Sequence, residues 1–291
     1  MNALLEGAAG RPDPIRRRLL QGVAFGMVAP ALPAAAQAPS VRKAAATPWR
    51  WVINEAVTGE TNFFLLTSRY RPWADFMTGH LKGRPIGIEP VVDIKRFMVV
   101  AQGQPKPELV FGKSVNQLAK LVRDNGYQPV VRRADPYKAA FIVAKNSPIK
   151  TLADAARARI VMPDEYAATT AVARAELRRQ NITSAEIVHV RFQEAVAQQV
   201  KSGAGQVGVV NPTTARKWAE EGGRVIAETQ PVVNWSVLTS PHVAADTVAQ
   251  LQEALLGMNT RETAILGALG IKEWAKAERK DFLALLDYTK E

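Results

Sequence analysis

The chain has 291 residues, 47% hydrophobic and 22% charged, an ordinary globular composition that excludes wholesale disorder. Its formal net charge of +11 favours anionic partners. The basic residues are dispersed and form no run interleaved with aromatic residues, so we expect no nucleic-acid partner. The chain has no cysteine, which excludes disulfides, thiolate metal sites, a cysteine nucleophile and a lipidated N-terminal cysteine.

The N-terminus has the pattern of a removable export signal. Three arginines at 16–18 precede an apolar run at 19–32, which is shorter than the ~20 residues that a membrane-spanning helix needs. Small residues follow, and we expect cleavage near Ala36, which gives a signal peptide at 1–36 and a tether at 37–48. The arginines and the apolar pair after them fit a twin-arginine signal, and an ordinary secretory signal with one extra arginine is the alternative. We therefore expect a periplasmic protein.

Apolar periodicity and turn residues predict alternating strands and helices in the first half of the remaining chain. The predicted strands are 49–54, 86–92, 109–111 and 128–132, and the predicted helices are 72–81, 94–102 and 114–125. Pro72 suits the first position of its helix. Ser114 with Gln117 three residues later predicts a capping box.

The same alternation continues to the end of the chain. The predicted strands are 139–144, 159–162, 187–191, 206–210, 225–227 and 235–238. The predicted helices are 165–179, 193–201, 246–258, 261–269 and 280–288. Two further helices are predicted to begin at 151–154 and at 211. Asn211 is the expected N-cap of its helix, with Pro212 at the first position. Strands that alternate with helices predict an α/β fold with mostly parallel sheets. Two blocks of strands favour two lobes over one very wide sheet.

No motif for catalysis, a cofactor or a metal is convincing. The glycine pattern at 203–208 matches a dinucleotide-binding motif, but it follows a helix and leads into a strand, which is the reverse of the required context. The three histidines, His80, His189 and His242, are isolated and show no metal-ligand spacing. We therefore expect no cofactor, no metal and no enzymatic activity.

Three strand-to-helix junctions are more informative. They lie at 111–114, 163–170 and 210–214, and each places hydroxyl or amide side chains at a predicted helix start. Helix starts present unpaired amides and partial positive charge, which can bind an anion. In open α/β sheets such junctions line the crevice at the carboxyl ends of the strands. Three of them together predict a ligand-binding cleft.

Several stretches resemble one known family. They are 70–76, 107–112, 137–149 followed by Thr151-Leu152-Ala153-Asp154, and 205–210. The chain resembles the phosphate/phosphite/phosphonate-binding (PhnD-like) branch of the type II periplasmic solute-binding proteins of ABC transporters. The resemblance implies two lobes joined by a hinge, with lobe I at 49–134 and 233–291 and lobe II at 135–232. It also implies a monomer that passes a small ligand to a membrane permease.

Combined with the junctions, the resemblance implies a cleft that binds a small anion such as phosphate, phosphite, a phosphonate or an organic acid. The residues expected to line it are Lys113, Ser114, Tyr137, Tyr166, Thr169, Thr170, Asn211 and Thr213. The chain departs from the family where Tyr166-Ala167-Ala168-Thr169 replaces a frequent Ser-Thr-Ser-Gly and where Asn211 replaces a frequent carboxylate, which puts a phosphonate in doubt. Two other functions stay open: a ligand-sensing partner of a membrane sensor kinase, and an enzyme on a related two-lobed fold.

Overall fold

The computed structural model describes residues 47–55 and 59–291. The predicted signal peptide and most of the predicted tether lie outside the described residues. No helix in the described part of the chain is long and apolar enough to cross a membrane. The strands are β1 (Trp49–Asn54), β2 (Ile86–Val91), β3 (Leu109–Gly112), β4 (Gln128–Arg133), β5 (Ala140–Val143), β6 (Arg159–Met162), β7 (Glu186–His189), β8 (Val207–Val210), β9 (Arg224–Glu228), β10 (Ser236–Thr239) and β11 (Trp274–Lys276). The helices are α1 (Phe63–His80), α2 (Ile94–Gln102), α3 (Val115–Asp124), the 3-10 turn η1 (Ala153–Ala155), α4 (Ala168–Arg179), α5 (Gln193–Lys201), α6 (Pro212–Glu220), α7 (Ala245–Arg261), α8 (Thr263–Ala268) and α9 (Arg279–Thr289).

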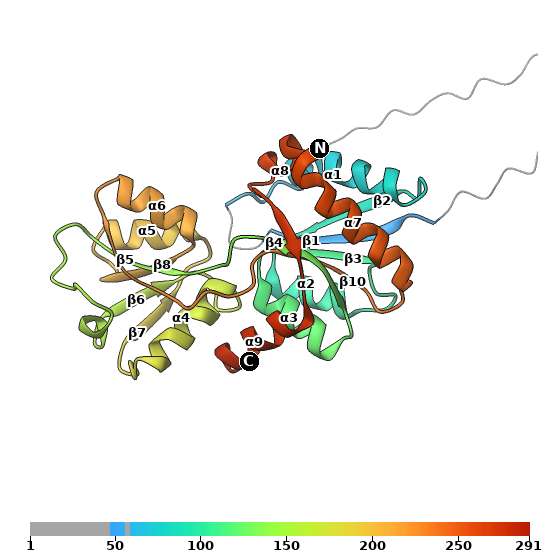
Figure 1. Cartoon of the computed structure of the whole chain (residues 1–291). Coiled ribbons are helices and arrows are strands. Elements are labelled where there is room, and N and C mark those ends of the chain that lie inside the picture. Colours follow the sequence, from blue (N-terminus) through green and yellow to red (C-terminus); the bar gives the residue numbers. More distant parts are fainter. Residues whose placement is uncertain (1–46, 56–58) are drawn as a thin grey trace, which may run out of the picture. The chain divides into compact units, whose positions relative to one another are not determined.

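The strands form two sheets, which can be followed in Figure 1. The first sheet has the order β11-β4-β10-β3-β1-β2, and the second has the order β7-β6-β8-β5-β9. In the first sheet β10 and β11 run against the other strands, and in the second sheet β5 alone is reversed. The predicted α/β fold with two sheets flanked by helices is confirmed. Both sheets are mixed, because four of the strand pairs in the described residues are parallel and five are antiparallel. Strand β5 directly follows β4 of the first sheet, and β10 directly follows β9 of the second, so both of these reversed strands lie where the chain passes from one sheet to the other.

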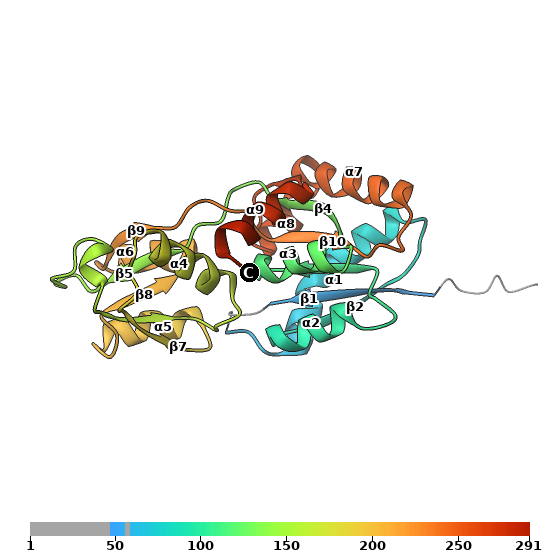
Figure 2. The same cartoon turned by 90° about the horizontal axis from the view of Figure 1, so that it is seen from below.

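Helices cover both faces of the first sheet (Figures 1 and 2). On one face α1, α7 and α8 bury an aromatic core around Trp51, Trp73 and Trp274. On the other face α2 and α3 pack against the sheet through residues such as Phe97 and Leu118. We call this sheet with α1, α2, α3, α7 and α8 the first lobe.

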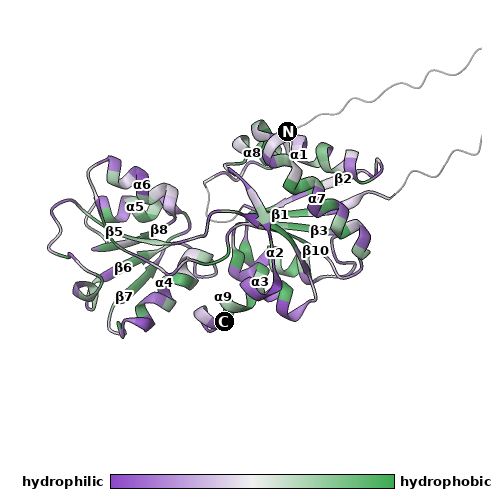
Figure 3. Ribbon diagram, in the orientation of Figure 1, coloured by the Kyte–Doolittle hydropathy of each residue, from purple (hydrophilic) through white to green (hydrophobic). Residues whose placement is uncertain are grey.

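The second sheet is covered in the same way. Helices α5 and α6 pack on one face through Val196, Val200 and Trp218, and α4 covers the other face through Val172 and Leu177. Figure 3 shows that hydrophobic residues concentrate on the strands of both sheets, as expected for strands covered on two faces. We call this sheet with α4, α5 and α6 the second lobe.

Two segments join the lobes, and they run side by side through an antiparallel bridge between Tyr137 and Val232. Helix α9 also contacts both lobes, because Phe282 and Leu285 belong to a buried cluster that contains residues of α3 and α4. The first sheet holds β1 to β4, β10 and β11, and the second holds β5 to β9. The lobe bounds and the hinge between two separately moving lobes stay predictions.

Three local predictions differ from the structure. Helix α1 begins at Phe63 and contains Pro72 in its interior, where we expected the helix to start. The Asn62 side chain caps this helix by accepting from the amides of Phe64 and Leu65. Strand β11 was not predicted. The third difference, at the start of α3, concerns the site and is described below.

Candidate ligand-binding site

A cavity of about 290 Å³ is lined by residues of both lobes. Four helices begin at its wall: α3 from the first lobe, and α4, α5 and α6 from the second. The lining residues are Lys113, Ser114, Arg133, Asp135, Tyr137, Ala168, Thr169, Gln193, Glu194, Asn211, Pro212, Thr213, Thr214, Arg216, Asn234 and Trp235. First-turn amides have no partner within their own helix, so all four helix starts can offer donors and partial positive charge to one space.

The start of α3 holds a buried hydroxyl without a partner. Ser114 is the N-cap residue and is 1% exposed, yet its side chain makes no capping bond, and its Oγ has no hydrogen-bond partner among the described residues. The predicted capping box is therefore wrong. The Gln117 side chain that should complete it donates instead to the Tyr166 carbonyl over 3.0 Å. The Ser114 hydroxyl is left as a donor on the cavity wall.

The start of α4 contributes a pair of hydroxyls. Tyr137 Oη and Thr169 Oγ1 are 2.6 Å apart, and Gln193 Nε2 donates to Thr169 Oγ1 over 2.9 Å. Two hydroxyls carry two hydrogens, and the bond between them uses one. Because Gln193 donates rather than accepts here, one O–H hydrogen of the pair remains for the cavity. All three side chains are buried, and burial raises the pKa of Tyr137, so the phenol stays protonated at neutral pH.

The start of α6 is fixed by two side-chain amides. Asn211 Oδ1 accepts from the Thr214 amide over 2.8 Å, which confirms the predicted N-cap. Gln193 Oε1 accepts from the Asn211 amide over 3.0 Å, so α5 positions the start of α6. Asn211 also lines the cavity, and its Nδ2 group is a further hydrogen-bond donor. Thr213 lies in the first turn and also lines the cavity.

The register of the strands in the first sheet brings together the residues on the first-lobe side of the cavity. Asn54 of β1 and Ser236 of β10 are both register partners of Gly112 in β3. The residues just beyond these positions therefore meet at one edge of the sheet. They form a row across β1, β3, β10 and β4, which we call the edge row: Glu55, Lys113, Trp235 and Arg133.

The edge row contains a buried ion pair. Lys113 Nζ donates to Glu55 Oε2 over 2.6 Å, and the Glu55 side chain is 1% exposed. Tyr70 Oη also donates to Glu55, and the Arg69 guanidinium lies 3.8 Å from its carboxylate. Burial lowers the pKa of Lys113 from its ordinary value even though Glu55 opposes this shift. Burial, together with the Glu55 charge, raises the pKa of Tyr70. Lys113 thus reaches the cavity already paired.

Two cations face the Trp235 ring, which forms the middle of the edge row. Lys113 Nζ lies 4.4 Å and the Arg133 guanidinium carbon 4.5 Å from the ring centroid, and both are cation–π distances. Arg133 also makes two hydrogen bonds to the Asp135 carboxylate, over 3.0 and 2.7 Å. Asn234 Oδ1 accepts from the Trp235 amide and Asn234 Nδ2 donates to the Asp135 carbonyl, which holds this segment in place.

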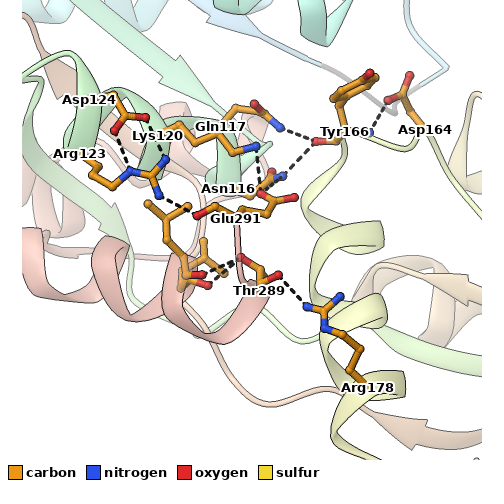
Figure 4. A network of polar contacts seen from close by, with 12 residues as sticks. Asn116, Gln117, Lys120, Arg123, Asp124, Asp164, Tyr166, Arg178, Thr289 and Glu291 are labelled. Atoms are coloured by element: carbon orange, nitrogen blue, oxygen red, sulfur yellow. Dashed lines mark hydrogen bonds and ion pairs between the residues drawn. The ribbon is translucent and has the colours of Figure 1, made fainter. Parts of the chain in front are cut away.

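Six of the eight predicted site residues line the cavity, and two do not. The Thr170 hydroxyl donates to the carbonyls of Pro163 and Asp164 and is buried in the turn before α4. Tyr166 lies at a separate contact between the lobes, where its carbonyl accepts from Asn116 and Gln117 of α3, as Figure 4 shows. The Tyr166 ring faces Lys95 Nζ at 4.6 Å rather than lining the cavity.

The sequence reasoning missed several residues of the site, namely Glu55, Arg133, Asp135, Gln193, Glu194, Arg216, Asn234 and Trp235. Glu55 had a usable signal, because it directly follows the predicted strand at 49–54. Its pairing with Lys113 and the contact between Lys113 and Trp235 depend on the strand order β10-β3-β1, which the sequence pattern does not specify.

The described residues contain no group of three His, Cys, Asp or Glu side chains that could hold a metal ion. His189 is one of the three histidines that show no metal-ligand spacing in the sequence. Its Nε2 lies 2.9 Å from an Arg174 nitrogen and its Nδ1 lies 2.7 Å from the Pro163 carbonyl. The glycine motif also has the predicted context, since Gly203 ends α5 with φ +77° and Gly208 lies in β8.

Known structures share this architecture. PhnD1 from Prochlorococcus marinus in complex with methylphosphonate is 14% identical, with a TM-score of 0.69 over 84% of this chain and 98% of that chain. A Xanthomonas citri protein bound to ATP is 14% identical, with a TM-score of 0.69 over 83% and 97% of the two chains. A binding protein component of a phosphonate ABC transporter from Pseudomonas aeruginosa is 14% identical, with a TM-score of 0.64 over 83% and 85%. These likenesses confirm the two-lobed fold.

Comparison with the sequences of known protein families identifies the family of this chain. No curated protein sequence matches the chain. The family described as "ABC transporter, phosphonate, periplasmic substrate-binding protein" matches residues 65–282, which is most of the chain. The chain therefore belongs to the periplasmic substrate-binding proteins of phosphonate ABC transporters.

Proposed function

We propose that this protein captures a small organic oxyanion in the cavity between its lobes and delivers it to the permease of an ABC transporter. The ligand class is an acid such as a phosphonate, a sulfonate or a carboxylate. The observation that carries the proposal is the meeting of four helix starts at one cavity beside the Ser114 hydroxyl, which is buried and has no hydrogen-bond partner among the described residues.

The hydrogen-bond donors that line the cavity favour an anionic ligand. The helix starts favour negative charge, and a buried hydroxyl without a partner carries a desolvation cost of about 1–3 kcal/mol that a ligand oxygen would relieve. The Tyr137–Thr169 pair supplies one further O–H hydrogen. A cavity of about 290 Å³ suits a small ligand, since it lies at the lower end of the roughly 300–1,000 Å³ of pockets that hold drug-sized ligands.

A thermal-shift screen tests the proposal with charged ligands and their neutral isosteres. Methylphosphonate, methanesulfonate and acetate are compared with dimethyl sulfone and acetamide. An anion at about 100 times its Kd should stabilise the folded protein by about 2.7 kcal/mol. At least one anion should raise the Tm and its neutral counterpart should not. Equal shifts from the neutral compounds would refute the oxyanion part of the proposal.

We also propose that residues 1–36 direct export and are removed near Ala36. The arginines at 16–18 and the apolar run after them support this. N-terminal sequencing of protein recovered from the periplasm should begin near Gln37. The double variant Arg16→Lys and Arg17→Lys should block export by the twin-arginine route and leave an ordinary secretory signal working. Size-exclusion chromatography with light scattering tests the proposed monomer.

A further inference from the structure

We propose that Gln193 fixes the hydrogen-bond polarity of the second-lobe side of the cavity, so that this side offers hydrogens to a ligand and not lone pairs. Gln193 is then a positioning residue, because it acts through the hydroxyls of Tyr137 and Thr169. This inference rests on the proposed function. It adds the residue that makes the cavity prefer a bare ligand oxygen over an isosteric group that carries hydrogens.

A backbone amide fixes the orientation of the Gln193 carboxamide. The Asn211 N–H can only donate, so the Gln193 atom that lies 3.0 Å from it is the oxygen Oε1. The other end of the carboxamide, Nε2, lies 2.9 Å from Thr169 Oγ1 and donates to it. Gln193 is 1% exposed, and exchanging its two ends would turn its NH2 group toward the Asn211 N–H, donor against donor.

This orientation decides where the hydrogens of the two hydroxyls go. Tyr137 Oη and Thr169 Oγ1 are 2.6 Å apart, so one hydrogen lies between them. The second hydrogen cannot be donated to Gln193, since Nε2 is itself a donor. Within the described residues neither oxygen has another hydrogen-bond partner, and both residues line the cavity. The second hydrogen is therefore left for a ligand, whichever of the two oxygens carries it.

A ligand group that carries hydrogens fits this side of the cavity poorly. A ligand N–H would have to be accepted by a lone pair of Tyr137 or Thr169, and the second O–H hydrogen would then have no acceptor. All three side chains are buried, and a buried donor without a partner is costly. A site built around one set of hydrogen bonds rejects an isostere that leaves its groups unpaired. We therefore expect a sulfonate to bind more tightly than the corresponding sulfonamide.

The variant Gln193→Glu reverses the polarity and keeps the shape of the side chain. One carboxylate oxygen still accepts from the Asn211 amide, but the other can only accept from Thr169. Thr169 must then donate to the carboxylate and Tyr137 to Thr169, so both hydroxyl hydrogens are used and lone pairs face the cavity. At about pH 8 the new carboxylate is ionised, which its place at the start of α5 favours.

Isothermal titration calorimetry with an isosteric pair of ligands tests the inference. Methanesulfonate presents only oxygens, and neutral methanesulfonamide presents an NH2 group in place of one of them. Gln193→Glu should raise the Kd of methanesulfonate at least about tenfold and lower that of methanesulfonamide at least about tenfold. The added charge alone would leave the neutral ligand unaffected, and a damaged site would bind both ligands less tightly.

Two further variants complete the test. Gln206→Glu is the matched control, because Gln206 Oε1 also accepts from a backbone amide, that of Arg159, over 2.8 Å, and Gln206 lies outside the cavity lining. It should change either Kd less than about threefold. Gln193→Met removes both ends of the carboxamide without adding a charge. Thr169 is then free to donate or to accept, so the preference for the sulfonate should fall at least about threefold without reversing.

Each result has a distinct meaning. A Gln193→Glu variant that keeps the wild-type preference, or that weakens both ligands alike, would overturn the inference and leave the proposed function standing. Loss of methanesulfonate without a gain of methanesulfonamide would assign the effect to charge and would also overturn the inference. If the wild type binds no oxyanion, the proposed function is refuted, and methanesulfonamide binding to Gln193→Glu and not to the wild type would still support the polarity set by Gln193.

Discussion

The Arg178 guanidinium donates to the Thr289 carbonyl over 2.6 Å, which joins α4 of the second lobe to α9. Figure 4 shows this bond beside the contacts of Glu291, which accepts from Asn116 and pairs with Lys120, both on α3 of the first lobe. The C-terminal segment is thus bonded to a helix of each lobe. It acts as a third connection, in addition to the two segments bridged at Tyr137 and Val232.

Arg178→Ala should destabilise the protein modestly. The bond joins a charged donor to a carbonyl but lies on an exposed side chain, so we expect a loss of about 1 kcal/mol in the free energy of unfolding by urea. Arg96→Ala, which removes an exposed guanidinium from α2, is the matched control and should cost less than about 0.5 kcal/mol. An equal loss in both variants would argue against the role of the α4–α9 bond.

Glu176→Gln should change how stability depends on pH. Burial acts to raise the pKa of Glu176, but hydrogen bonds from Arg179, Gln180 and Tyr288 outweigh it, so the pKa lies below its ordinary value of 4.5. A lowered pKa in the folded state stabilises the fold above pH 4.5, and this contribution is lost as the pH falls through the folded-state pKa. At neutral pH the variant should be less stable by about 2 kcal/mol.

The same contribution should disappear in acid. Urea unfolding curves of the wild type and Glu176→Gln, measured from neutral pH downward, should converge below pH 4.5. Glu186→Gln, which removes an exposed partner of Arg159, should differ from the wild type by less than about 0.5 kcal/mol at every pH. A stability difference for Glu176→Gln that does not change with pH would show that packing, not charge, carries the effect.

Local sequence patterns predicted most elements because each depends on nearby residues. Helices α2 and α5 match their predicted bounds, and Asn211 caps α6 as expected. The start of α1 was wrong because Pro72 was interpreted as a first position. The buried residues Leu66, Tyr70, Trp73 and Met77 keep helical spacing on both sides of that proline, so the periodicity was the better guide.

The site was predicted in part for the same reason. Helix starts are local features, and the three predicted junctions all reach the cavity. Their electrostatics are not local, since Glu55 and Lys113 are far apart in the sequence and meet because β1 and β3 are neighbours in the sheet. The sequence pattern therefore predicted the donors of the cavity and missed the carboxylates that balance its cations.

Ser114→Ala should weaken ligand binding without destabilising the protein. The Ser114 Oγ is buried and has no partner among the described residues, so its removal should leave the free energy of unfolding unchanged or raise it by up to about 1 kcal/mol. Loss of a hydrogen bond to a charged ligand should raise the Kd of the anion found by screening about 10- to 100-fold.

Thr239→Val is the matched control for this prediction. Thr239 Oγ1 is also buried and unpartnered within the described residues, but it lies in β10 outside the cavity lining. The control should leave the Kd unchanged. A lower stability of Ser114→Ala with an unchanged Kd would mean that the serine hydroxyl serves the fold and not the ligand.

Thr169→Val and Tyr137→Phe should separate the two hydroxyls at the start of α4. Thr169→Val removes the hydroxyl that is bonded to Tyr137 Oη and accepts from Gln193 Nε2, which leaves two buried polar groups unpaired and should cost about 2 kcal/mol of stability. Tyr137→Phe leaves the Thr169 hydroxyl with its bond from Gln193 and its own hydrogen for the cavity. Thr169→Val should therefore raise the Kd more than about tenfold, and Tyr137→Phe less than about threefold. Titration calorimetry gives both constants, and a larger loss in Tyr137→Phe than in Thr169→Val would instead assign the cavity-facing hydrogen to the phenol.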